Sequence, residues 1–203
     1  MPVPYHTTQH EGSATIDADE NLAVHVWRFA QAASCLDSAA NMAAHGWLRP
    51  WESVQVSSQT AGRGQLRRQW HSPVGNVYVA LRLPLTPPFD GSAAAPALGA
   101  LLCEALRQDG WPVRLKWPND IVVCKKGAPP QKLAGILLEE RGGVLLAGIG
   151  INALWAPPAG LMRADAALEA TSLAALCAKS AQPLPTAEVL WQTLVKRMSG
   201  LKG

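Results

Sequence analysis

The stretch that decides the fold is Leu115–Asn152, which reads LKWPNDIVVCKKGAPPQKLAGILLEERGGVLLAGIGIN. Its apolar segments are short and rich in Val, Ile and Leu, which is typical of β-strands. A turn at Pro118-Asn119 separates the first two segments, and Arg141-Gly142-Gly143 joins the last two. A link this short predicts that those two strands pair antiparallel.

Working outward, further strands are predicted over residues 21–29, 52–59 and 77–85, and helices over 36–46 and 92–109. Asp37 or Ser38 is the expected N-cap of the first helix, and Gly46 its end. Residues 171–203 form a predicted helical tail, and the first twenty residues are polar, without a regular pattern. The whole chain, 1–203, therefore reads as a single α+β domain with a mixed sheet and helices.

Composition excludes several classes of protein. Hydrophobic residues make up 48% of the 203 residues and charged residues 16%, so the chain is globular rather than disordered. The net charge of +3 suits anionic small ligands and is too small to indicate nucleic acid. The four cysteines are scattered, so we expect reduced thiols and no zinc site. No apolar run is long enough to cross a membrane, and a cytoplasmic location is expected.

Residues 62–68, GRGQLRR, form a loop with two glycines and three arginines. Glycine lets backbone N–H groups approach a ligand closely, and guanidinium groups match phosphate or carboxylate. Trp70 follows and could cover an aromatic ring. A solvated basic loop without a ligand explains the same composition.

Two lysines beside turns also allow two interpretations, a ligand-binding one and a purely structural one. Lys116 precedes the Pro118-Asn119 turn, and Lys132 opens an apolar strand. Either could meet a bound anion or be an ordinary strand-end lysine. The sequence AGIGIN ends in Asn152, and its glycines indicate close approach of backbone or ligand. His71 beside Ser72 is not followed by a nucleophile elbow, which argues against a hydrolase.

Together the ordered blocks LDSAAN, SQTAGRGQLRRQWHSPVGNVYVALRL, LKWPNDIVV…KLAGILLE and GIGIN resemble the catalytic domain of biotin protein ligases. The resemblance implies the fold shared with class II aminoacyl-tRNA synthetases, with a mostly antiparallel sheet. It implies that biotin reacts with Mg²⁺-bound ATP to give biotinyl-5′-AMP, from which a lysine of a biotin carboxyl carrier protein takes the biotinyl group. The resemblance also allows a homodimer. Neither an N-terminal DNA-binding domain nor a full C-terminal domain is expected, so DNA is not an expected partner.

Carried over by position, the resemblance implies a set of site residues. Lys132 and Arg63 are the expected catalytic residues, with Lys132 at the carboxylate and phosphate. The expected substrate-binding residues are Ser38, Ala39, Ala40, Gln59, Arg63, Gly64, Gln65, Arg68, Trp70, Lys116, Asn119, Lys132, Gly135 and Asn152. Gln59 matches a glutamine that bonds the biotin head group, and Trp70 a tryptophan beside the adenine.

The chain departs from the family pattern at several of these positions. Ala39 and Ala40 stand where polar residues are usual, Gln65 replaces an arginine, and Arg67 replaces a glycine whose conformation would strain another residue. These changes predict weaker biotin affinity or a leakier adenylate. They also keep two alternatives open: a non-catalytic biotin-binding paralogue, and a ligase for another acid such as lipoate or octanoate.

Overall fold

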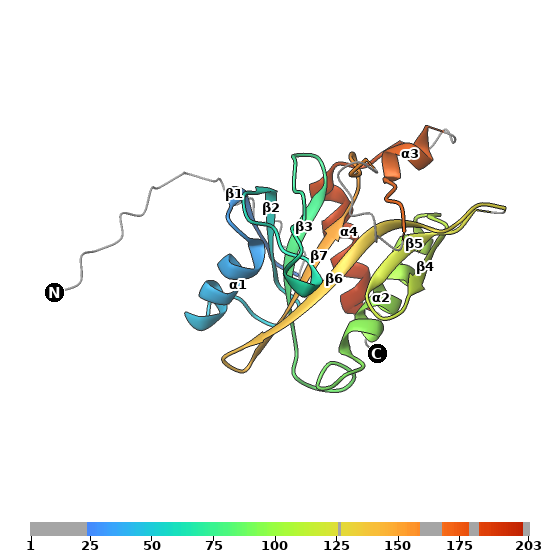
Figure 1. Ribbon diagram of the computed structural model, residues 1–203. Coiled ribbons are helices and arrows are strands. Elements are labelled where there is room, and N and C mark those ends of the chain that lie inside the picture. The colour runs from blue at the N-terminus through green and yellow to red at the C-terminus, as the bar shows by residue number, and fades with distance from the viewer. Residues whose placement is uncertain (1–23, 126, 159–167, 179–182, 201–203) are drawn as a thin grey trace.

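A computed structural model describes residues 24–125, 127–158, 168–178 and 183–200. Seven strands form one sheet in the order β1-β2-β3-β7-β6-β5-β4 (Figure 1). The strands are β1 (Val26–Ala32), β2 (Ser53–Gln59), β3 (Val77–Leu83), β4 (Val113–Lys116), β5 (Asp120–Val123), β6 (Gln131–Arg141) and β7 (Val144–Ile151). The helices are α1 (Cys35–Ala44), α2 (Ala94–Gln108), α3 (Leu173–Cys177) and α4 (Ala187–Gly200), with the 3₁₀ turn η1 at Gln65–Arg67.

Only β1 and β2 pair in parallel, and every other neighbouring pair is antiparallel. The expected mixed, mostly antiparallel α+β fold is therefore confirmed. The first strand begins at Val26, later than the alternation predicted, and residues 21–23 lie outside the described residues. Pairing with β2 sets this register, since Val26 lies opposite Ser53 and Ala32 opposite Gln59.

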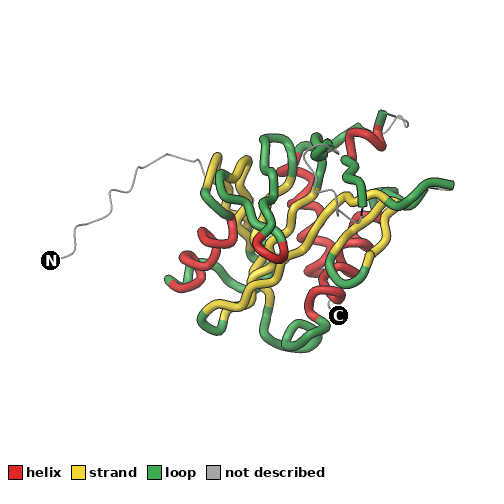
Figure 2. Tube along the Cα trace, viewed as in Figure 1, coloured by secondary structure: helices red, strands yellow, loops and turns green. Residues whose placement is uncertain are grey.

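The sheet separates two apolar layers, and alternate residues of β3 enter them. Val77, Val79 and Leu81 face the larger core, which α2 and α4 complete. Tyr78 and Ala80 face the smaller core beneath α1. Helices thus cover both faces of the sheet (Figure 2), and α1 has one face largely to itself.

The hairpin of β6 and β7 is as the sequence predicted. Gly142 and Gly143 both have positive φ, at 57° and 75°, and connect strands that pair antiparallel from Arg141↔Val144 to Ala134↔Ile151. Gly46 ends α1 with φ 75°, also as expected. The cap prediction was wrong, because Ser34 is the N-cap of α1 and both Asp37 and Ser38 lie within the helix.

None of the four cysteines is paired with another, which agrees with the expectation of free thiols. Within the part of the chain that the structure describes, no helix has both the length and the apolar character to cross a bilayer.

Candidate active site

A cavity of about 770 Å³ lies over the face of the sheet that carries α1, and the loop between β2 and β3 forms one wall of it. Eleven of the fourteen residues expected at the site line this cavity. They are Gln59, Arg63, Gly64, Gln65, Arg68, Trp70, Lys116, Asn119, Lys132, Gly135 and Asn152. Segments far apart in the sequence therefore meet at one hollow.

The three remaining residues, Ser38, Ala39 and Ala40, are not among those that line the cavity. Because α1 begins at Cys35, these residues fall in its second turn, and Ala39 is fully buried in the smaller core. Ser34, Cys35 and Leu36 take their place on the cavity wall. Sequence matching of the block LDSAAN missed this, since nothing in it marks where the helix begins.

Two lysines share one carboxylate at the cavity. Lys132 Nζ lies 2.5 Å from Asp120 Oδ1, and Lys116 Nζ lies 3.9 Å from Asp120 Oδ2. Lys116 and Asp120 are cross-strand partners in the β4–β5 hairpin. Lys132 lies near the start of β6, opposite Val122 of β5. Asp120 was not among the expected site residues. It concentrates two positive charges where an anion can reach them.

Arg63 is held by a second group of charges. Its guanidinium donates two hydrogen bonds to Asp37, at 2.8 and 2.9 Å, and its Nη2 lies 3.6 Å from Glu139 Oε1. Arg141 also donates to Asp37, at 2.8 Å. The hydrogen bond from Arg63, helped by Arg141, lowers the pKa of Asp37 from 3.8 to about 2. The same pairing raises the pKa of Arg63.

The two cationic groups stand at different points along the cavity. Lys132 Nζ lies 3.4 Å from the Cβ position of Gly135, whereas Arg63 is next to Glu139. Gly135 and Glu139 are four residues apart on β6, which at about 3.3 Å per residue is about 13 Å. Arg63 and Lys132 therefore line one cavity without meeting at a single point.

Trp70 lies flat against a bare part of the sheet. Gly135 and Gly150 are cross-strand partners on β6 and β7. A Cβ on Gly150 would come within 2.5 Å of the Trp70 ring, and one on Gly135 within 3.2 Å. Lys132 Nζ lies 5.5 Å from the ring centroid, a cation–π distance. The buried indole Nε1 has no hydrogen-bond partner within the described part of the chain.

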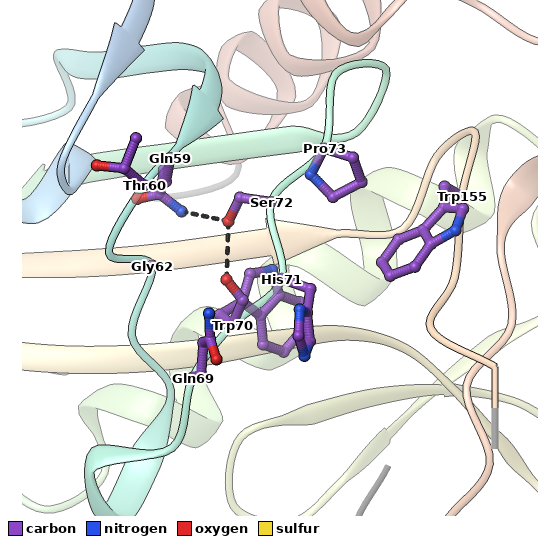
Figure 3. Close-up of a pocket in the computed structure, with 9 residues that line it drawn as sticks. All are labelled: Gln59, Thr60, Gly62, Gln69, Trp70, His71, Ser72, Pro73 and Trp155. Atoms are coloured by element: carbon purple, nitrogen blue, oxygen red, sulfur yellow. Dashed lines mark hydrogen bonds between the residues drawn. The ribbon is translucent and has the colours of Figure 1, made fainter. Parts of the chain in front are cut away.

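Both ends of the Gln59 side-chain amide are hydrogen-bonded to neighbours. Its Oε1 accepts from the Cys35 backbone N–H at 2.9 Å, and its Nε2 donates to Ser72 Oγ at 2.9 Å. A ligand head group would have to share this amide. Gln59, Trp70 and Ser72 also line a smaller cavity of about 440 Å³, which His71 and Trp155 help to enclose (Figure 3).

In the arginine-rich loop, the strained backbone conformation falls on a different residue from the one that the sequence predicted. The residue with positive φ is Leu66, at 56°, and Arg67 is not among the residues with positive φ. The glycine replaced by Arg67 is therefore not needed for the loop's conformation here. Leu66 is exposed at the mouth of the large cavity, and Arg68 is exposed with no ion-pair partner among the described residues.

Three buried asparagines fix the walls. Asn119 donates to the Ile136 carbonyl at 3.0 Å, and Asn152 donates to the Thr171 carbonyl at 3.1 Å. Asn76 accepts from the backbone N–H groups of Leu154 and Trp155, both at 2.9 Å. Asn119 and Asn152 thus shape the large cavity, and Asn76 holds the segment that bears Trp155.

Neither a metal cluster nor an activated thiol is present at the cavity. Among the described residues, no group of three or more His, Cys, Asp or Glu side chains could hold a metal ion. Burial raises the pKa of the Cys35 thiol to about 12, so this residue is not a nucleophile at neutral pH. The site offers cations and N–H donors rather than a covalent catalyst.

Residues 48–154 match the sequence profile of the Biotin/lipoate A/B protein ligase family, which is just over half of the chain. The chain belongs to this family. The matched region begins before β2 and ends just after β7, so it includes the loop of Arg63 and the strands of Lys132, Gly135 and Gly150.

Curated relatives match about half of the chain. A biotin–[acetyl-CoA-carboxylase] ligase of Paracoccus denitrificans is 37% identical over 125 residues, which is 56% of this chain and 49% of that protein. The bifunctional ligase/repressor BirA of Salmonella typhimurium is 38% identical over 118 residues, which is 53% of this chain and 34% of that protein. The chain therefore spans about half the length, or less, of these relatives.

Solved structures agree on the fold. Biotin protein ligase from Leishmania major, in complex with biotinyl-5-AMP, superposes with a TM-score of 0.72 at 24% identity, covering 86% of this chain and 73% of that one. The enzyme from Aquifex aeolicus, in complex with biotin and ATP, gives a TM-score of 0.67 at 24% identity, covering 87% and 69%. The expected biotin ligase fold, of the class II synthetase type, is confirmed.

Proposed function

We propose that the protein is an ATP-dependent ligase that activates biotin as biotinyl-5′-AMP and transfers the biotinyl group to a lysine of a carrier protein. The observation that carries this proposal is the pair Lys132 and Lys116 on one carboxylate, beside the bare glycines of β6 and β7. Membership of a ligase family, and relatives named for biotin ligation, support it.

The chemistry needs positive charge more than a nucleophile. A carboxylate must attack the α-phosphate of ATP, and both groups are anionic. Lys132 would reduce their repulsion and stabilise the charge that develops on the phosphate. In the free protein Asp120 pairs with Lys132. An entering anion would replace Asp120 as its partner, so the lysine changes partner without becoming an unpaired charge.

Arg63, Gly64, Gln65 and Arg68 would meet the phosphates and the nucleotide from the loop side of the cavity. Mg²⁺ would arrive with ATP and offset phosphate charge. Magnesium is usually held through one or two carboxylates together with phosphate oxygens and water. Asp120 is the one carboxylate among the described residues that line the cavity, and it is compatible with such a site.

Another acid, lipoate or octanoate, is compatible with one observation. Leu36 Cδ1 lies 2.8 Å from the Cβ position of Gly148, so this part of the wall is apolar. An apolar wall suits the tail of lipoate or octanoate as well as biotin. Thermal-shift titration with the three acids separates them, because the tightest ligand raises the melting temperature most at equal concentration.

Pyrophosphate release with biotin and Mg²⁺-bound ATP tests the first half of the reaction. Streptavidin blotting after addition of a biotin carboxyl carrier domain tests the second half. We expect both signals from the protein and neither from Lys132→Ala. Biotin binding without pyrophosphate would instead indicate the non-catalytic paralogue.

A further inference from the structure

A single hydroxyl joins three separate parts of the active-site wall. The Cys35 N–H donates to Gln59 Oε1, and Gln59 Nε2 donates to Ser72 Oγ at 2.9 Å. Ser72 Oγ in turn donates to the Trp70 carbonyl at 3.0 Å (Figure 3). Ser72 is buried, with 9% of its surface exposed. The start of α1, the end of β2 and the backbone of Trp70 are therefore tied together through Ser72.

Gly62 shows how tightly this connection is packed. A Cβ at this position would lie 2.5 Å from the Trp70 carbonyl oxygen, 2.7 Å from Ser72 Oγ and 3.0 Å from Gln59 Nε2. The Gly62 carbonyl also accepts from the Trp70 N–H at 2.9 Å. The chain closes into a loop at this point, and only a residue without a side chain fits there.

Trp70 borders both cavities. Its ring lies on Gly135 and Gly150. Apart from its contact with Lys132, the indole makes no polar interaction with the described residues, since none of them is a hydrogen-bond partner of Nε1. Polar anchoring of Trp70 therefore comes from its backbone, through Gly62 and Ser72.

We propose that Ser72 is a positioning residue: its hydroxyl holds Trp70 over the glycine pair and so keeps the activated acid in the large cavity. This inference rests on the proposed adenylation. Ser72 does not touch the reacting atoms and acts through Trp70. When the hydroxyl is removed, the Trp70 carbonyl loses its donor and Gln59 loses its acceptor, so the tryptophan wall loosens.

The test compares Ser72→Ala with Ser58→Ala. Ser58 lies on β2, one residue before Gln59, and lines neither cavity. For Ser72→Ala we expect KM for biotin, and the rate of biotinyl-AMP release to solution, to rise by about tenfold, because misplaced contacts weaken binding. We expect the single-turnover rate constant for pyrophosphate formation at saturating substrates to stay within about twofold. Ser58→Ala should match the parent in all of these.

Two further variants separate positioning from general damage. Ser72→Thr keeps the hydroxyl and is expected to restore retention of the adenylate. Gly62→Ala keeps Ser72 but forces its Cβ against the Trp70 carbonyl, so it should release adenylate as Ser72→Ala does. Parental retention in both Ser72→Ala and Gly62→Ala would overturn the proposal, as would a fall in kcat with KM for biotin unchanged.

Hydrogen exchange at the Trp70 backbone amide tests the hydrogen-bonded connection between Ser72 and Trp70 independently of enzymatic activity. If the parent protein releases no pyrophosphate with biotin and ATP, the proposed function fails and this measurement decides alone. We expect exchange of the Trp70 N–H to be about tenfold faster in Ser72→Ala than in Ser58→Ala, since local opening becomes easier. Equal rates in the two variants would refute the role of Ser72.

Discussion

The Lys132 ammonium lies 2.5 Å from the carboxylate of Asp120 and faces the same cavity as Trp70. An ion pair at this distance is strong enough to fix the lysine, yet Lys132 remains 27% exposed and open to an anion. The lysine is therefore held in place before any substrate arrives. The first expectations concern this pair.

Lys132→Ala should lower the rate of biotin-dependent pyrophosphate release by about a hundredfold or more, because a preorganised cation is lost from the phosphate. Lys125→Ala is the matched control, since Lys125 is exposed on the loop after β5 and does not line the cavity. Single-turnover assays measure both. Activity of Lys132→Ala above a tenth of the parent would show that another group does this work.

Asp120→Asn should tighten the binding of inorganic pyrophosphate. Removing a negative charge about 4 Å from an ammonium is worth about 1 kcal/mol in a water-like dielectric, or about fivefold in Kd. Isothermal titration calorimetry measures this, with Glu104→Gln on α2 as a control at a residue that does not line the cavity. An unchanged Kd would mean that Asp120 does not compete with anions for Lys116 and Lys132.

Asp37→Asn should remove a pH-dependent part of the stability. The folded pKa of Asp37 is lowered to about 2 from 3.8, so its ion pairs stabilise the fold above pH 3.8 and are lost as the pH falls through 2. We expect the variant to be less stable than the parent at pH 6, by under about 1 kcal/mol because the side chain is partly exposed.

Melting temperatures recorded from pH 6 to pH 2 check this expectation. The difference between Asp37→Asn and the parent should shrink between pH 4 and pH 2. Asp90→Asn, at an exposed carboxylate without an ion pair among the described residues, should show no such trend. A constant difference across the range would mean that the charge of Asp37 does not stabilise the fold.

Gly150→Ala should destabilise the protein through Trp70. The new Cβ would lie 2.5 Å from the indole ring, and overpacking of this kind costs about 1–3 kcal/mol. Gly91→Ala has open space around it and should change stability little. Urea unfolding of Gly150→Ala in a Trp70→Ala background provides the decisive comparison, because the penalty should disappear there. A penalty that persists would place the strain elsewhere.

Much of the fold was predictable because its signals are local. Short apolar segments with a glycine link predicted the β6–β7 hairpin, and Gly142 and Gly143 adopt the positive φ that such a link uses. The position of β1 was less accurate. Its residues are mostly exposed at the sheet edge, so alternation does not mark its start, and pairing with β2 does.

Eleven of the predicted site residues line one cavity, and their roles in binding stay predictions, whereas the contacts among them were not predictable. Motif order brought Arg63 and Lys132 to one cavity, yet nothing local to either residue indicates Asp37 or Asp120 as its partner. The Asp37–Arg63 pair joins α1 to a loop 26 residues away. In the sequence Ser72 stands out only as the neighbour of His71, because its hydrogen bond with Gln59 crosses the loop.

Strand β6 sets the distance between the two cationic groups of the candidate site. Lys132, Gly135 and Glu139 all belong to β6. The distance between the lysine end and the arginine end of the cavity is therefore set by the backbone of a single strand. Inserting one residue between Gly135 and Glu139 would lengthen that interval by about 3.3 Å and turn Glu139 to the opposite face. A change in loop length leaves this distance unaltered, whereas an insertion or deletion within β6 changes it.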